Sequence, residues 1–290
     1  MLTIDPKEVS TAELHGLMLG AVGPRPISFA STVDKDGNPN LSPFSFFNMF
    51  SANPPILIFS PARRVRGNTV KHTLENILET REVVINIVNY DLVHQASLSS
   101  TEYDKNINEF EKAGLTMLAS EKVKPFRVKE SPVQFECKVN EVVHLGTEGG
   151  AGNLIICEVL KMHVHENILD ESGKIDQSKI DLVARMGGNW YTRANKGLFE
   201  VPKPLRTRGI GVDEIPVEIK NSKILTGNDL GKLGNVENLP TKKEISDYLA
   251  ENDLTERIKS EPTERIHALA KQYLNKNETT AAWKILMAKQ

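Results

Sequence analysis

A strict alternation of apolar and polar residues in the middle of the chain places the tightest limit on its fold. Val133, Phe135, Cys137 and Val139 alternate with a polar residue at every position between them. This period of two is typical of a β-strand that buries one face and exposes the other. Further strands are expected at residues 26–33, 41–47, 56–60, 83–88 and 153–164. About six strands with few helices between them predict a mainly β, mostly antiparallel barrel.

Peripheral helices are expected where a capping residue precedes apolar residues at helical spacing. Asp5 followed by Pro6 predicts a helix start near the N-terminus. Apolar residues at i, i+4, i+7 and i+8 predict a second helix over residues 68–80. A short third helix is expected between Asp104, as its cap, and Gly114, just past its end.

The character of the chain changes after residue 205. All 10 Phe precede residue 200, whereas residues 206–290 hold 14 Lys and Arg and 13 Asp and Glu. Gly209, Gly211 and other glycines predict an irregular linker, and Thr241 with Glu244 predicts a capping box. We therefore predict a barrel domain over residues 1–205 and a charged linker with a helical C-terminal extension over residues 206–290. The apolar stripes of the extension are expected to dock on the barrel, and the alternative is an interaction module.

The overall charge and the first residues exclude several classes of protein. Lys and Arg number 36 against 38 Asp and Glu, so no basic surface for nucleic acid or for anionic lipid is expected. No apolar run has the length of a membrane span, and the first residues lack the pattern of a secretory signal. A cytoplasmic location is expected, and Cys137 and Cys157 are interpreted as small core residues.

A basic segment between a strand and a helix is the first candidate site. The strand ends at Ser60, a loop with Arg63 and Arg64 follows, and Lys71 and Thr73 lie in the first turns of the predicted helix. Free N–H groups at a helix start, together with Lys and Thr side chains, bind phosphate oxygens. The alternative is a solvated basic loop before a helix packed on the core.

An aromatic segment at residues 40–50 is the second candidate. It holds four of the Phe residues beside Ser42, Ser45 and Asn48. Aromatic rings among small hydroxyl groups suit a flat heteroaromatic ligand that needs both apolar cover and hydrogen bonds. The alternative is a core strand, which Pro43 would confine to an edge or a bulge.

Two further motifs carry weaker signals. The segment from Arg185 to Tyr191, RMGGNWY, combines paired glycines with two aromatic residues, and it indicates either a close backbone approach or a structural turn. His163 and His165 share one face of a strand at a spacing that suits a metal, but no third ligand is evident nearby, so no metal site is predicted.

Seven segments, taken in order, resemble the flavin reductase-like, or flavoredoxin, family of FMN-binding split barrels. They lie at residues 23–48, 53–60, 71–77, 109–116, 131–139, 153–159 and 185–191, and include SPVQFECKV and RMGGNWY. The resemblance ends near Leu205. It implies an antiparallel Greek-key split β-barrel with FMN at a homodimer interface, and hydride transfer between NAD(P)H and the flavin.

The resemblance also implies roles for individual residues. The phosphate pocket falls on Ser60, Lys71 and Thr73, with Arg63 or Arg64 beside them. The contacts to the flavin ring fall on Ser28, Ser42, Pro43, Phe44, Ser45 and Phe46, and Arg185 and Tyr191 lie near the flavin mouth. His72 departs from the family, whose members commonly have Asp between this Lys and this Thr, and it makes the local charge more positive.

The resemblance leaves two activities open. The first is an NAD(P)H-dependent flavin reductase, and the alternative is an FMN-binding electron-transfer protein that a partner protein reduces without nicotinamide turnover. The sequence leaves open the electron acceptor, the choice of NADH or NADPH, the tightness of FMN binding and the role of the last 85 residues.

Overall fold

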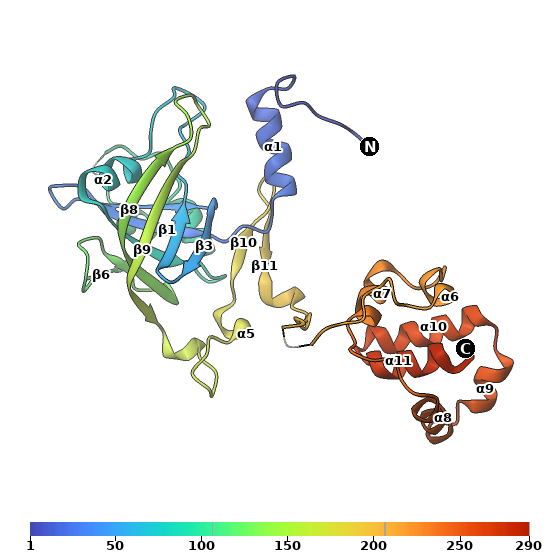
Figure 1. Cartoon of the computed structure of the whole chain (residues 1–290). Coiled ribbons are helices and arrows are strands. Elements are labelled where there is room, and N and C mark those ends of the chain that lie inside the picture. The colour runs from blue at the N-terminus through green and yellow to red at the C-terminus, as the bar shows by residue number, and fades with distance from the viewer. Residues whose placement is uncertain (106, 206, 290) are drawn as a thin grey trace. The chain divides into compact units, whose positions relative to one another are not determined.

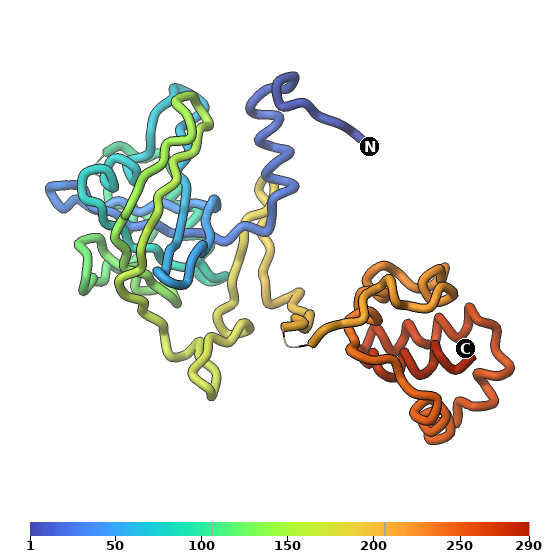
Figure 2. Tube along the Cα trace, viewed as in Figure 1, coloured from blue at the N-terminus to red at the C-terminus, as the bar shows by residue number. Residues whose placement is uncertain are grey.

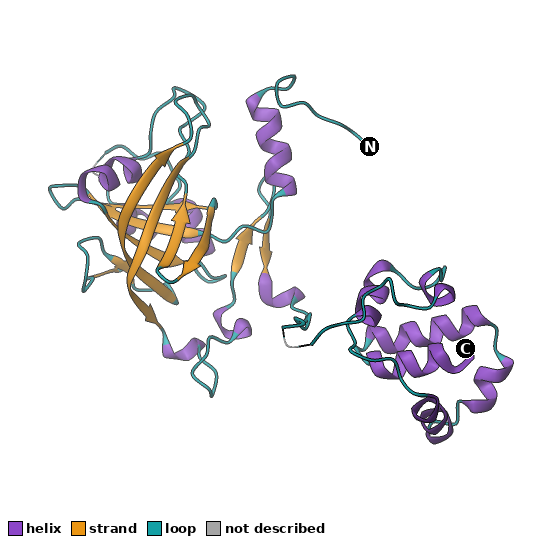
Figure 3. Ribbon diagram, viewed as in Figure 1, coloured by secondary structure: helices purple, strands orange, loops and turns teal. Residues whose placement is uncertain are grey.

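The computed structural model describes residues 1–105, 107–205 and 207–289. The chain divides into two compact units, Met1–Phe199 and Glu200–Gln290, and each has a hydrophobic core of its own. The first unit carries the sheet and the second is helical (Figures 1 and 3). Among the described residues, none of the helices has both the length and the apolar character that a bilayer crossing requires.

The first unit is built around a seven-stranded sheet of a split barrel, with the strand order β2-β1-β5-β8-β9-β4-β3. Every neighbouring pair in this order is antiparallel. The strands are β1 (Ser28–Val33), β2 (Pro39–Phe44), β3 (Phe47–Ala52), β4 (Pro55–Phe59), β5 (Glu82–Ile87), β8 (Val133–His144) and β9 (Asn153–Val164). The mainly β, antiparallel fold expected from the sequence is therefore confirmed.

The longest hairpin, β8 with β9, forms the middle of the strand order (Figure 3). Both strands have 12 residues, and they pair from Val133 opposite Val164 to His144 opposite Asn153. Cys137 and Cys157 lie in this hairpin as buried, free thiols, and burial raises the pKa of each. The interpretation of both cysteines as core residues is confirmed.

The run at residues 41–47 is two strands rather than the single one expected. It ends as β2 at Phe44 and resumes as β3 at Phe47, and these strands stand at the two ends of the strand order. Pro43 has no N–H to donate, which agrees with an edge position for β2. On this edge, the Leu41 N–H donates to a carboxylate oxygen of Glu109 over 3.0 Å.

Three helices begin later than the sequence indicated. Helix α1 (Thr11–Ala21) starts after Ser10, which accepts from the Glu13 N–H, whereas Asp5 only closes a separate turn. Helix α2 (His72–Thr80) is shorter than the predicted range of 68–80, because Gly67 and Asn68 have φ values of +78° and +49°. Helix α4 (Glu109–Ala113) is capped by Asn108 rather than Asp104.

The remaining elements of the first unit are short. They are α3 (Val93–Leu98), β6 (Met117–Leu118), β7 (Arg127–Val128), η1 (Glu166–Ile168), α5 (Gln177–Ile180), β10 (Val183–Arg185), β11 (Tyr191–Arg193) and η2 (Ala194–Gly197). The β10–β11 hairpin is joined to the segment after α1, since the Arg25 and Arg185 backbones exchange hydrogen bonds of 2.9 Å. Figure 2 shows both elements standing beside the barrel.

The second unit packs its helices around Trp283, whose indole N–H donates to the Leu233 carbonyl over 3.0 Å. The capping box of Thr241 with Glu244 is confirmed at the start of α8. The helices are α6 (Val217–Lys220), α7 (Gly227–Gly234), α8 (Lys242–Glu251), α9 (Thr255–Ser260), α10 (Thr263–Asn275), α11 (Thr279–Leu286) and η3 (Met287–Lys289).

The irregular segment expected from the glycines after Leu205 is confirmed only at Gly209 and Gly211, whereas Gly227, Gly231 and Gly234 belong to α7. The segment packs closely on α7, because the Gly211 N–H donates to the Gly234 carbonyl and a Cβ at Gly209 would lie 2.6 Å from that oxygen. The apolar stripes do not need the barrel for burial. They are already packed together in the core of the second unit, and include Ile266, Leu269, Tyr273, Trp283 and Leu286.

Candidate functional site

A cavity of about 350 Å³ lies between the end of β2, helix α3 and the β10–β11 hairpin. It brings together Pro43 and Ser45 from the aromatic segment with Arg185 and Tyr191 from the RMGGNWY segment. These segments are far apart in the sequence, and the structure places them on one cavity. The other residues of its wall are Ile27, Val93, Ala96, Ser97, Ser100 and Asn189.

A smaller, polar pocket of about 20 Å³ holds most of the predicted phosphate residues. Lys71 is the N-cap residue of α2, and Thr73 lies in the first turn of that helix. Arg64 and Ser42 line the same pocket. The rest of its wall consists of Asn40, His72, Ser99, Thr101, Glu102, Tyr103 and Glu109.

The loop before α2 is held by the guanidinium group of Arg64. Its Nη1 donates to the Thr69 hydroxyl over 2.9 Å and to the Val70 carbonyl over 2.8 Å. At the other side of the pocket, the Asn40 amide donates to the Thr73 hydroxyl oxygen over 3.0 Å. These contacts position one cation and one hydroxyl group at the start of a helix, where anions bind.

Burial and neighbouring charges shift two pKa values in this pocket. Burial lowers the pKa of Lys71 and the positive Arg64 adds to this effect, while Glu102 opposes it. Burial also raises the pKa of Glu109, although the Leu41 N–H bonds to its carboxylate. An anion next to Lys71 relieves the repulsion between the two cations, and Glu102 already does so in part.

The two pockets meet at strand β2. Ser42 lines the small pocket, whereas its neighbour Pro43 and then Ser45 line the large cavity. Successive side chains of a strand point to opposite faces, so one strand serves both pockets. The arrangement places a polar pocket that holds Arg64 and Lys71 next to a larger cavity.

Three of the predicted ring-contact residues lie outside both cavity walls. Phe44 is buried in the barrel core, with its ring centroid 5.4 Å from that of Phe59. Phe46 is exposed, and its ring lies edge-on to His15. Ser28 is fully buried, and its hydroxyl has no hydrogen-bond partner among the described residues. Phe44 therefore agrees with the alternative interpretation of this segment, a core strand.

Two predicted phosphate residues also serve the fold. The Ser60 hydroxyl accepts from the Asn153 N–H over 3.0 Å and joins the end of β4 to the start of β9. The Arg63 guanidinium donates to the side chain and to the carbonyl of Asn68, at 2.6 and 2.7 Å. Neither residue lines the small pocket, whereas Arg64, Lys71 and Thr73 do.

The paired glycines of the RMGGNWY segment allow a close backbone approach, one of the two interpretations of the sequence. A Cβ at Gly187 would lie 3.0 Å from the Cα of Gly20, at the end of α1. Arg25 adds a second link, because its guanidinium donates to the Met186 carbonyl over 2.7 Å and to carbonyls at the end of α1. The motif thus fixes the hairpin that carries Arg185 and Tyr191.

Within this hairpin, Arg185 is held in place on the cavity wall. Its guanidinium carbon lies 4.7 Å from the centre of the Tyr191 ring, and its Nη2 donates to the Gly188 carbonyl over 2.9 Å. The aromatic face attracts the cation, and the hydrogen bond fixes the direction of the guanidinium group. Arg185 therefore presents a positioned positive charge to the large cavity.

Sequence reasoning missed a run of hydroxyl residues at the end of α3 and just beyond it. Ser97 and Ser100 line the large cavity, and Ser99 and Thr101 line the small pocket. The run reads SLSST, and its density of hydroxyl groups at the end of a helix indicates a polar site. Its position next to β2 depends on the packing of the fold, which the sequence does not reveal.

A second cavity of about 310 Å³ adjoins the first. The two share Val93, Ser97, Asn189 and Tyr191 as common wall residues. On its far side, the Arg193 guanidinium lies 3.8 Å from the centre of the Tyr90 ring and pairs with Asp181. The two cavities therefore lie next to each other in the first unit.

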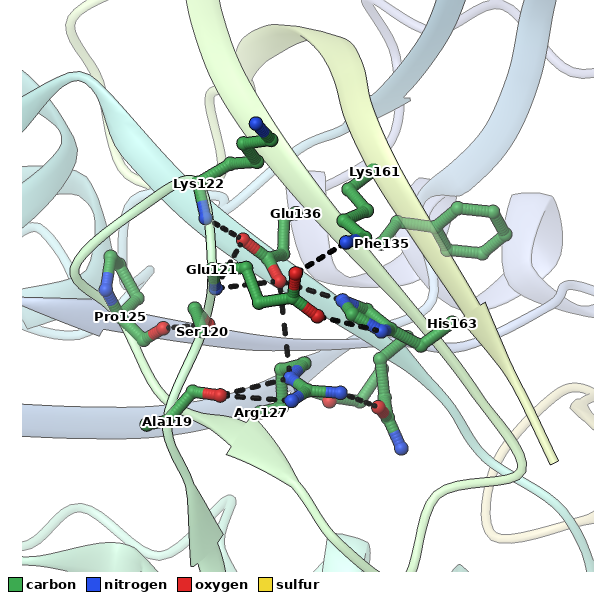
Figure 4. A network of polar contacts seen from close by, with 12 residues as sticks. Ala119, Ser120, Glu121, Lys122, Pro125, Arg127, Phe135, Glu136, Lys161 and His163 are labelled. Atoms are coloured by element: carbon green, nitrogen blue, oxygen red, sulfur yellow. Dashed lines mark hydrogen bonds and ion pairs between the residues drawn. The ribbon is translucent and has the colours of Figure 1, made fainter.

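A separate polar network surrounds Glu136 on β8 (Figure 4). Its buried carboxylate accepts from the N–H groups of Glu121 at 3.0 Å and Lys122 at 2.5 Å. His163 Nε2 lies 2.7 Å away, so this histidine pairs with a carboxylate. Burial raises the pKa of Glu136, but the hydrogen bonds from these three residues outweigh burial and lower it overall. The network fastens the loop at residues 119–126 to the hairpin.

Comparison with known proteins identifies the family to which this fold belongs. The model of the flavin reductase like domain matches residues 21–183, more than half of the chain. An uncharacterized protein of Aquifex aeolicus is 40% identical over 188 residues, which is 65% of this chain and 93% of that protein.

Solved structures of similar proteins share the fold. Nitrilotriacetate monooxygenase component B from Bacillus cereus is 30% identical with a TM-score of 0.65, and the match covers 69% of this chain and 98% of that one. Flavoredoxin of Desulfovibrio vulgaris is 22% identical with a TM-score of 0.54, and the match covers 62% of this chain and 91% of that one. The family model ends at residue 183, so the second unit lies outside it. The chain belongs to the flavin reductase-like family.

Proposed function

We propose that the protein is a flavin oxidoreductase that binds FMN and accepts hydride from NAD(P)H. The observation that carries the proposal is the junction of two pockets at β2. One has Arg64, Lys71 and Thr73 for a phosphate group, and the other has about 350 Å³ for a ring. Ligand cavities of this size are typical for cofactors.

The residues present fit FMN in their chemistry. Two cations and a hydroxyl group at a helix start match a phosphate monoester. Ser45, Ser97 and Ser100 supply hydroxyl groups along the cavity wall.

When bound, the flavin supplies the hydride chemistry, so the protein needs no acid–base pair of its own. The chain's residues bind and orient the ring. Arg185, held against Tyr191, places a positive charge on the cavity wall and stabilises negative charge on a reduced ring. The adjoining cavity of about 310 Å³ supports a place for a second ligand, the nicotinamide.

The visible spectrum of the purified protein, before and after FMN titration, tests the cofactor. A protein that takes up no FMN would contradict the proposal. Anaerobic mixing with NADH and with NADPH then tests the activity, since hydride transfer bleaches the flavin. Binding of FMN without bleaching by either nucleotide would favour the alternative, an electron carrier that a partner protein reduces.

We also propose that the first unit forms a homodimer. Helix α1 has no buried side chain, and it exposes Leu17, Met18 and the following Val22 by 44%, 55% and 61%. Strand β3 likewise exposes Met49 and Phe50 by 67% and 64%. Exposed apolar residues at this density support a protein interface. Light scattering after size-exclusion chromatography should give twice the chain mass, and a monomer would contradict the proposal.

The electron acceptor is proposed at the level of its class. The similar chain from Bacillus cereus is a component of a monooxygenase, so an oxygenase partner that consumes reduced flavin is one candidate. Two buried thiols that stay free fit the reducing cytoplasm. An assay of flavin release after reduction distinguishes transfer of free flavin from transfer within a complex.

A further inference from the structure

The small pocket contains an anion that belongs to the protein itself. Glu102, in the loop after α3, places its Oε1 2.7 Å from Arg64 Nε and 4.0 Å from Lys71 Nζ. The hydrogen bond to Arg64, the charges of Arg64 and Lys71 and that of nearby Arg66 lower the pKa of Glu102, so it is a carboxylate at neutral pH. Its oxygen lies on the same two cations that suit a phosphate group.

The pocket is too small for a phosphate group while Glu102 stays there. Its volume of about 20 Å³ is near the space that one water molecule needs. The side chains of Arg64, Lys71 and Glu102 differ in their freedom to move. Arg64 is tied to Thr69 and Val70, and the Lys71 side chain is 27% exposed, whereas the Glu102 side chain is 64% exposed. The carboxylate is therefore the group that can leave the pocket into solvent.

We propose that Glu102 is an affinity-setting residue whose carboxylate competes with the FMN phosphate for Arg64 and Lys71. This inference rests on the proposed function and deepens it, because it concerns how firmly the same site holds its flavin. Each binding event must break the contacts of Glu102 with Arg64 and Lys71, and each departure restores them. Glu102 therefore weakens FMN binding and speeds FMN release, which makes the flavin an exchangeable ligand.

The substitution Glu102→Gln tests the competition, because it removes the charge and keeps the size. Glu141→Gln is the matched control, since Glu141 is exposed on β8 and the change in net charge is the same. For each full-length protein, the dissociation constant and the release rate are measured for FMN and for riboflavin, which has no phosphate group. Equal melting temperatures would show that both variants are folded.

We expect Glu102→Gln to tighten FMN about three- to tenfold, mostly through slower release, and to leave riboflavin within about 1.5-fold. Glu141→Gln should leave both flavins unchanged. Unchanged FMN affinity in Glu102→Gln would overturn the inference while the proposed function stands. Equal tightening of FMN and riboflavin would also overturn it, because the effect would not run through the phosphate group.

Inorganic phosphate provides a second probe that does not depend on flavin binding. Phosphate should raise the melting temperature of Glu102→Gln more than that of the native protein or of Glu141→Gln. If FMN does not bind to any of the three proteins, the proposed function fails. The effect of phosphate on the three melting temperatures then still shows whether Glu102 competes with a phosphate group for Arg64 and Lys71. Equal phosphate effects on all three would overturn the inference.

Discussion

Removing the Glu136 carboxylate should destabilise the first unit strongly. The change Glu136→Leu keeps the shape but leaves the N–H groups of Glu121 and Lys122 and the ring of His163 without their acceptor. A buried donor without a partner costs about 1–3 kcal/mol, and loss of one member of a buried charged pair costs about 3–5 kcal/mol. We expect a loss of about 3–5 kcal/mol, and about half of that for Glu136→Gln, which keeps one acceptor oxygen.

Urea unfolding measures this loss and can separate the two units. Circular dichroism reports on the whole chain, whereas fluorescence of buried Trp283 reports on the second unit, because the other tryptophan, Trp190, is 78% exposed. The Glu136 variants should lower the unfolding midpoint of the first unit and leave the Trp283 transition in place. The exposed Glu141→Gln, on the same strand, should stay within about 0.5 kcal/mol of the native protein.

The pH dependence checks the origin of the effect. The pKa of Glu136 is lowered in the folded protein, so the stability that its carboxylate contributes is present above the unfolded pKa and is lost as pH falls through the folded pKa. The difference between the native protein and Glu136→Gln should therefore shrink in acid. A loss below about 1 kcal/mol for Glu136→Leu at neutral pH would refute the reasoning.

Three further outcomes are expected. Lys71→Ala should weaken FMN by about 1.5–3 kcal/mol in a fluorescence titration, if a charge-assisted hydrogen bond is lost, and an unchanged dissociation constant would remove Lys71 from the phosphate site. Trp283→Ala should cost the second unit about 3–5 kcal/mol in thermal unfolding, while FMN affinity stays the same. A chain that ends at Phe199 should remain folded and bind FMN as the full chain does, and loss of binding would show that the second unit supports the site.

Period-two patterning predicted β8, whereas β1 is buried along its whole length and shows no such alternation. The limits of β9 agree with the predicted range, and the edge position of β2 is one of the two positions that Pro43 allowed. Helix starts were less predictable, since an Asp or Ser can either cap a helix or close a turn. Asp5 closes a turn with Lys7, and Ser10 caps α1 instead.

The site was predictable in its segments but not in its details. The cationic segment and the aromatic segment do meet, yet Phe44 turns into the core and Ser60 joins two strands. Which side chains of a strand face a ligand depends on which neighbours already fill the core, and one sequence does not reveal this. The hydroxyl run at Ser97–Thr101 reaches the site only through the packing of α3 beside β2.

The free edge of β2 has a consequence for how copies of the protein behave in solution. Along this edge, the Leu41 N–H is already bonded to Glu109, and Pro43 has no N–H at all. A strand from another molecule that arrived here would find no donor at either position. Strand addition is a common route from folded sheets to aggregates, and blocked edges suppress it. The same stretch that borders both pockets thus also protects the sheet from growing.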